Sequence, residues 1–359
     1  MSRGRPGRTT AHRFAPERPI TTGLPIPTTD SLTLVLSPLR ITRAVLALAL
    51  ALTAWLAVPA AAHAFTIGMS DQKVGMWEDP RFQKLGVEQV RLLMSYDSVL
   101  AGDFSRYDAW MTAAAVRGAD VLLTIQHHSR VPSRLPSNAQ YRRVVRILVK
   151  RYPWVKTMSA WNEANHHSQP TDTRPRRAAQ YYNVMRKVCR GCRIVAADVL
   201  DSANMLPWLA KFKRYAKHPR IWGLHSYGDA NRFRAFRTTA TRQLLGAVKG
   251  EVWMTETGGI VRFGRGFPGG RRGEARAAKA VKRTFQVARM SSRVKRVYLY
   301  HWDADRKFLT WDSAFVAANG RARPALNVLR KELNKQRRHS RLPVIPRLPR
   351  YAKKKLPLY

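Results

Sequence analysis

The sequence predicts an α/β protein with a single domain, a (β/α)8 or TIM barrel, and three observations support this prediction. Short apolar segments rich in β-favouring residues alternate with helical segments, as in a parallel sheet. Eight such repeats lie between residues 65 and 333, and this number and length are those of a barrel. No glycine-rich phosphate loop follows an early strand, which argues against an open, doubly wound sheet.

The eight repeats can be located from their composition. Strands are expected at 65–70, 90–95, 120–126, 155–161, 193–199, 221–227, 252–257 and 294–302. Helices are expected at 81–87, 107–117, 139–151, 174–188, 205–215, 232–248, 274–291 and 324–333. The last helix begins at Pro324, and proline suits the first position of a helix because the missing N–H would have no partner there.

The first 64 residues have the pattern of an exported leader. Two arginines precede an apolar run, residues 44–58, and an Ala-His-Ala sequence ending at Ala64 then fits a cleavage site. Together these features indicate a secretory signal peptide. The alternative is a membrane anchor, but the run of 15 apolar residues falls short of the ~20 that span a bilayer. We therefore expect an N-terminal extension and signal peptide over 1–64, and a secreted or cell-envelope protein.

The chain carries an unusually large positive charge. Its 65 Lys and Arg exceed its 22 Asp and Glu by 43, yet 45% of its residues are hydrophobic, so a folded core is expected. Only seven of the basic residues precede residue 65. Such a charge favours nucleic acid, an anionic surface or an acidic glycan as partner. Because no nucleic-acid-binding module is recognisable, no specific nucleic-acid partner is expected. An anionic cell wall or an acidic glycan is then the possible partner, and the protein is expected to be a monomer.

The segment 336–359 is expected to form a basic tail after a barrel domain that covers 65–335. Its four prolines and interleaved Arg and Lys disfavour a helix. Such a tail could hold an anionic surface or be a solvated terminus, and the sequence leaves both readings open.

The only two cysteines, Cys189 and Cys192, are separated by Arg and Gly. A zinc site would need a second pair. In an exported protein a short local disulfide is the expected state, with two free thiols as the alternative.

Polar residues close several predicted strands, at the end where a barrel carries its active site. Glu163 follows the fourth strand and Glu256 lies in the seventh, on roughly opposite sides of the barrel mouth. Two carboxylates facing across a pocket are what glycoside hydrolysis needs, one to donate a proton and one to stay ionised.

At these residues the sequence resembles the retaining glycoside hydrolases of clan A, a cellulase-like (β/α)8 superfamily, and the resemblance covers essentially the whole barrel. In that clan an Asn-Glu pair closes the fourth strand, with the Glu as acid/base, and a Glu on the seventh strand is the nucleophile. Asn162-Glu163 and Glu256 match these positions. The clan often adds an Arg on the second strand, a His and a Tyr near the end of the sixth, and a Trp on the eighth. These residues are matched here by Arg91, His225, Tyr227 and Trp302.

The resemblance implies a catalytic or substrate-binding role for each matched residue, and an ordinary structural role is the alternative in each case. Arg91 would hold Glu256 ionised by charge-assisted hydrogen bonds, or would form a structural ion pair. Asn162 would donate to the sugar 2-hydroxyl, or would cap a turn.

Three further matches have similar alternatives. His225 and Tyr227 would share one face of a strand, because side chains alternate with a period of two. Tyr227 would then orient Glu256, or would be a buried phenol bonded elsewhere. Trp302 would give a flat apolar floor for a sugar ring, or would pack in the core.

The sequence thus predicts a secreted retaining β-glycoside hydrolase that cleaves O-glycosidic bonds of a poly- or oligosaccharide by double displacement. The two carboxyl groups would then lie about 5–5.5 Å apart. No cofactor is expected, and no metal either, because His166 and His167 lack the helical register of a zinc protease. The alternative is a catalytically silent carbohydrate-binding barrel that docks on an anionic cell envelope. The sugar and its linkage are not predicted.

Overall fold

The structure, a computed structural model, describes residues 65–305 and 310–340, without the side chains of the last two. The expected signal peptide and most of the expected tail lie outside the described residues. Among the described helices, none is long and apolar enough to cross a membrane.

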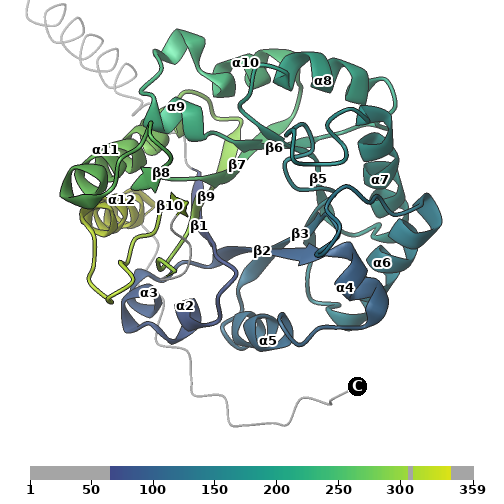
Figure 1. Ribbon diagram of the computed structural model, residues 1–359, viewed down its shortest axis with the longest axis horizontal. Coiled ribbons are helices and arrows are strands. Elements are labelled where there is room, and N and C mark those ends of the chain that lie inside the picture. The colour runs from purple at the N-terminus through teal and green to yellow at the C-terminus, as the bar shows by residue number, and fades with distance from the viewer. Residues whose placement is uncertain (1–64, 306–309, 341–359) are drawn as a thin grey trace, which may run out of the picture. The chain divides into compact units, whose positions relative to one another are not determined.

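Eight parallel strands close into a barrel in the order β1-β2-β3-β4-β5-β6-β7-β9 (Figure 1). Each strand pairs with its neighbours in the chain, and β9 pairs with β1 to close the ring. The fold class predicted from the sequence is therefore confirmed. The strands are β1 Thr66–Ser70, β2 Gln89–Ser95, β3 Asp120–Gln126, β4 Thr157–Ser159, β5 Arg193–Leu200, β6 Ile221–His225, β7 Glu251–Thr257 and β9 Val294–Tyr300.

Helices surround this barrel (Figure 1). The structure has α2 Gly75–Glu78, α3 Pro80–Leu85, α4 Tyr96–Ala101, α5 Asp108–Val116, α6 Asn138–Arg151, α7 Pro175–Val188, α8 Met205–Lys213, α9 Tyr227–Asn231, the 3-10 turn η1 Phe236–Thr238, α10 Ala240–Ala247, α11 Gly270–Ala288 and α12 Pro324–Ser340. Side-chain caps fix several of these starts. At α6, for example, Ser137 Oγ accepts from the Gln140 N–H and Gln140 Oε1 accepts from the Ser137 N–H, a reciprocal pair that satisfies two otherwise free donors.

The short helices α2, α4 and α9 were not expected from the sequence, and two other expectations about helices are wrong. The helix expected over 232–248 is wrong in its first part, because α10 begins only at Ala240, where Thr239 caps it and Asp229 accepts the N–H groups of Ala240 and Thr241. The expectation that no helix forms from residue 336 onward is also wrong, since α12 continues to Ser340. The prolines that oppose a helix begin only at Pro343.

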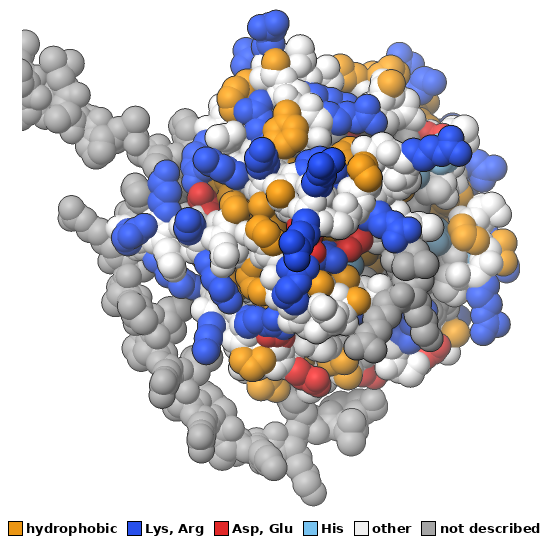
Figure 2. Space-filling view, turned by 60° about the vertical axis from the view of Figure 1, so that its left-hand side comes forward, with side chains coloured by type: hydrophobic (Ala, Val, Ile, Leu, Met, Phe, Trp, Pro, Cys, Tyr) orange, Lys and Arg blue, Asp and Glu red, His pale blue; other side chains and the backbone are white. Residues whose placement is uncertain are grey.

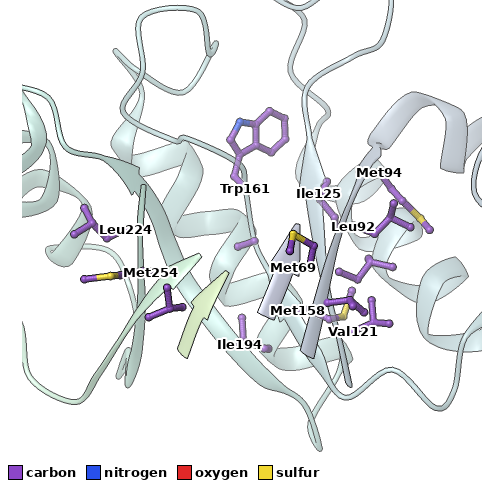
Figure 3. Close-up of a cluster of buried hydrophobic side chains, with 14 of the residues drawn as sticks. Met69, Leu92, Met94, Val121, Ile125, Met158, Trp161, Ile194, Leu224 and Met254 are labelled. Atoms are coloured by element: carbon purple, nitrogen blue, oxygen red, sulfur yellow. The ribbon is translucent and has the colours of Figure 1, made fainter. Parts of the chain in front are cut away.

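The apolar core has two layers. The larger lies between the barrel and its helices and takes alternate side chains such as Leu92 and Met94 of β2 (Figure 3). The smaller lies among inward-facing side chains of five strands: Leu122, Val195, Ile221, Trp253 and Tyr298. Because inward and outward side chains alternate along β2, Arg91 points into the barrel, where the site lies.

The described surface carries positive charge widely. Figure 2 shows Lys and Arg side chains spread over the face that it draws, with few Asp and Glu among them. Cys189 and Cys192 form a disulfide after α7, which confirms the expected local bridge.

Candidate active site

A cavity of about 1050 Å³ opens where the barrel strands end. Its lining includes Asn162, Glu163, Tyr227 and Glu256. Four of the seven site residues predicted from the sequence therefore face one pocket. Arg91 and His225 lie beneath them, fully buried, and Trp302 lies elsewhere.

Glu256, on β7, is held by two donors. Arg91 Nη1 donates to Oε2 at 2.6 Å, and the Tyr227 hydroxyl donates to Oε1 at 3.0 Å. Both contacts were expected, but the reason given for Tyr227 is wrong. Strand β6 ends at His225 and Tyr227 begins the short helix α9, so the two side chains reach the site from different elements rather than from one face of a strand.

Arg91 connects Glu256 to a second carboxylate that the sequence analysis missed. Its Nη2 donates to Asn162 Oδ1 at 2.6 Å and to Asp198 Oδ2 at 3.1 Å. Asp198 lies on β5 and is fully buried. Burial alone would raise the pKa of this carboxyl, but the nearby charges of His225 and Arg91 lower it to about 2. The sequence does contain a signal for this residue, because Asp198 is the one carboxylate within the apolar run of β5.

His225 lies between the carboxylates. Its Nδ1 is 3.1 Å from Glu163 Oε1 and 4.0 Å from Glu256 Oε1, and its Nε2 is 3.4 Å from Asp198 Oδ1. Burial would lower the pKa of this imidazole, but Glu256 and Asp198 raise it to about 10. His225 is therefore a cation near neutral pH.

This cation sets the protonation of Glu163. Burial favours the protonated carboxyl, but the hydrogen bond and the charge of His225 together lower the Glu163 pKa below its ordinary value. Glu163 is thus ionised near neutral pH. Glu163 can therefore donate a proton only at acidic pH, so a reaction that uses it as the acid should depend on pH.

The backbone around Glu163 is fixed by the barrel. Glu163 follows β4 and has φ 43°, a left-handed conformation that is uncommon for residues other than glycine. The preceding Asn162 N–H donates to Ile125 O at 3.0 Å, and the following Ala164 N–H donates to Asp198 O at 2.8 Å. Strands β3 and β5 therefore hold the turn from both sides, so that the carboxylate projects into the pocket.

The shared contact to His225 Nδ1 limits the distance between the two carboxylates. The nearest oxygens of Glu163 and Glu256 can be at most about 7 Å apart, which excludes the widest separations found in inverting enzymes. This limit is compatible with the ~5–5.5 Å of retaining enzymes.

Trp302 does not form a sugar-binding floor, so this expectation is wrong. Its side chain is 1% exposed, its ring packs against Phe82, and its Nε1 donates to Asp79 Oδ2 at 3.0 Å. The strand was expected to run to residue 302 but ends at Tyr300. Tyr300, two residues earlier, is the aromatic residue from this strand that lines the pocket.

One wall of the pocket is aromatic and comes from two loops. Strand β8 (Arg262–Phe263) pairs antiparallel with β10 (Trp311–Asp312). The Trp311 ring contacts the rings of Tyr227 and Phe263, with centroids 4.9 and 4.8 Å away. Flat apolar rings beside hydrogen-bonding groups suit a sugar, which has both apolar faces and hydroxyl groups.

Of the two histidines that follow Glu163 in the loop, one borders the pocket. His166 lines the pocket, with Nδ1 4.0 Å from Glu163 Oε2, and His167 is exposed beside it. Within residues 65–305 and 310–340, no three His, Cys, Asp or Glu side chains are grouped to hold a metal ion.

Comparison with known proteins gives matches in structure alone. No protein-family model matches the sequence, and no curated protein does. Among solved structures, xylanase 10B from Thermotoga maritima matches with a TM-score of 0.57 and 11% identity, over 78% of this chain and 97% of the xylanase. GH5_18 from Streptomyces cattleya, solved with GlcNAc, matches with a TM-score of 0.53 and 16% identity, over 77% and 81% of the two chains.

A psychrophilic endo-β-1,4-xylanase of glycoside hydrolase family 10 also matches, with a TM-score of 0.57 and 12% identity over 75% of this chain and 97% of that one. At these identities the likeness concerns the fold, and it confirms the sequence-based resemblance at that level. The described chain has the (β/α)8-barrel fold found in glycoside hydrolases of families 5 and 10.

Proposed function

We propose that this protein is a secreted retaining β-glycoside hydrolase, with Glu256 as nucleophile and Glu163 as acid/base. The observation that carries the proposal is the pair of pocket carboxylates that share His225, one of them held by Arg91 and Tyr227. The fold shared with GH5 and GH10 structures supports it. Secretion rests on the leader pattern before Phe65.

The first chemical step would form a covalent glycosyl-enzyme. Glu256 attacks the anomeric carbon and forms a C–O bond, while the bond to the leaving oxygen breaks and Glu163 gives its proton to that oxygen. Arg91 and Tyr227 keep Glu256 oriented for the attack. Since only protonated Glu163 can act as acid, the free enzyme should work best in acid.

The second step would release the sugar with retained configuration. Glu163, now ionised, takes a proton from water as the water oxygen attacks the anomeric carbon, and the bond to Glu256 breaks. His225 favours the ionised form of Glu163 that this step needs. The same contact therefore opposes the first step and supports the second.

The test is hydrolysis of aryl β-glycosides and of a panel of xylan, mannan, β-glucan and uronate-containing polymers. E163A should lower kcat with glycans by about 10²–10⁴-fold, and E256A by at least as much. Added azide should restore turnover of activated aryl glycosides, giving a β-glycosyl azide from E163A and an α-glycosyl azide from E256A.

A matched control lies on the same strand. Glu251 starts β7 and bonds Arg193 and the Trp253 indole rather than the pocket, so E251Q should keep normal activity. Equal residual signals from the wild type and E256A would contradict hydrolysis and favour a silent carbohydrate-binding barrel. N-terminal sequencing of exported protein should begin at Phe65, and a start at Met1 would contradict cleavage of the leader.

A further inference from the structure

A second cavity, of about 620 Å³, is lined by residues from the start of α7 and the end of α8. These two helices lie side by side on the outside of the barrel (Figure 1). It shares no lining residue with the pocket that holds the carboxylates. We call it the α7–α8 groove. Five of its lining residues are basic and none is acidic; the basic ones are Arg174, Arg176, Arg177, Lys211 and Arg214.

The five cations have no carboxylate partner among the described residues. Arg177 donates to the Asn138 amide oxygen at 3.4 Å, and Arg176 stacks over the ring of Tyr215, 5.2 Å from its centroid. The other three are exposed. In the catalytic pocket, by contrast, two of the four Lys and Arg side chains in the lining, Lys73 and Arg234, each form an ion pair with an aspartate. Clustered cations repel one another, so an anion that enters the groove would relieve this repulsion.

We propose that the α7–α8 groove binds an acidic polysaccharide at a site separate from the catalytic pocket. Guanidinium and ammonium groups bind carboxylate and sulfate oxygens through charge-assisted hydrogen bonds. The groove is concave and large enough for a short length of one polymer chain, a shape that suits a membrane surface poorly.

The groove also lacks the features of a single-stranded nucleic-acid site. Such sites stack successive bases on several aromatic side chains. Tyr215 is the one aromatic residue in the lining, and Arg176 already occupies one face of its ring. The free face of a single tyrosine beside cations fits a charged sugar better than a row of bases.

This second site would change how the protein works on an insoluble or polymeric substrate. A chain held in the α7–α8 groove stays near the protein, so its local concentration at the catalytic pocket rises without any new catalytic contact. Binding of a polysaccharide in the α7–α8 groove does not require hydrolysis in the catalytic pocket. An experiment can therefore contradict the proposed binding site without contradicting the proposed hydrolase activity, and the reverse.

The experiment compares two triple variants of the full chain, each in an E256A background so that the polymer is not consumed. The groove variant is R174Q/K211Q/R214Q. The control, R272Q/K279Q/K282Q, removes the same charge from exposed positions of α11 that form no ion pair with a described residue. Helix α11 lies across the ring of helices from α7 (Figure 1). Such a control is needed because Lys and Arg are spread over other faces as well (Figure 2).

Binding to polygalacturonate is measured by isothermal titration at 50 and 150 mM NaCl, with neutral dextran, a 20-base-pair DNA and phosphatidylglycerol vesicles as other probes. The groove variant should raise the Kd for polygalacturonate about tenfold or more, and the control less than about threefold. Equal weakening by both variants would overturn the proposal, as would absence of polygalacturonate binding at 50 mM NaCl. A larger loss of DNA or vesicle binding than of polygalacturonate binding would assign the groove to that partner instead. Equal melting midpoints of the two variants verify that both fold.

Discussion

Arg91 and Arg321 form ion pairs of equal length, but the first arginine is buried and the second is exposed. Comparing the two tests how much the buried ion pair of the active site contributes to stability. Arg91 Nη1 to Glu256 Oε2 and Arg321 Nη2 to Glu274 Oε1 both measure 2.6 Å. The Arg91 side chain is 0% exposed and that of Arg321 is 54% exposed. If burial, and not distance, decides what a pair contributes, the two arginines should respond very differently to removal.

The perturbation is R91M, which keeps most of the side-chain volume and removes the charge. It leaves the fully buried Asp198 and the mostly buried Glu256 without their arginine, and breaking a buried pair in this way costs about 3–5 kcal/mol. We expect the free energy of unfolding at pH 7 to fall by about this amount. R321M should leave it nearly unchanged, since exposed pairs contribute little.

The assay is urea unfolding followed by tryptophan fluorescence. Adding D198N to R91M removes one of the uncompensated charges and should recover part of the loss, which a double-mutant cycle measures. An R91M protein within about 1 kcal/mol of the wild type at pH 7 would refute the view that the buried network depends on this cation.

Three further predictions concern the same site. H225N removes the cation that lowers the pKa of Glu163, so the alkaline limb of the kcat/KM profile should move to higher pH; an unmoved limb would show that another group is the acid. Because the pKa of His225 is raised from 6.5 to about 10, its stabilisation is complete below pH 6.5 and is lost as pH rises towards 10. Urea unfolding should therefore show that the wild type loses more stability than H225N between pH 7 and 10. Y300A should raise KM by roughly fivefold through a lost ring contact of about 1 kcal/mol, whereas W302F should lower the melting midpoint and leave KM unchanged; the reverse pattern would restore Trp302 to the sugar site.

The fold was predictable because the signals in the sequence are local. Strand β3 was expected at 120–126 and lies there, because its apolar run ends in polar residues on both sides. Helix α6 was expected from 139 and begins at Asn138, because Ser137 and Gln140 cap it. The carboxylates were found for a related reason, since the ends of parallel strands meet at one edge of the barrel.

The errors occurred where the outcome depends on distant parts of the chain. The end of β9 at Tyr300 rather than at 302 decides which aromatic faces the pocket, and no nearby residue marks that end. The role of Asp198 depends on Arg91 and His225, which lie on other strands. Tyr227 reaches Glu256 from a helix that starts at the strand end, so alternation along a strand gave the right residue for a wrong reason.

The short β8–β10 ladder has a consequence for redesign of this protein. Trp311 pairs with Phe263 across the ladder, and Asp312 accepts two hydrogen bonds, both 2.6 Å long, from Arg323 before α12. The loop after β7 and the loop after β9 thus form one interlocked part of the pocket wall. A graft of either loop alone from another barrel would leave its partner with an unpaired backbone edge. Exchange of substrate preference by loop transfer should therefore succeed only when both loops are moved together.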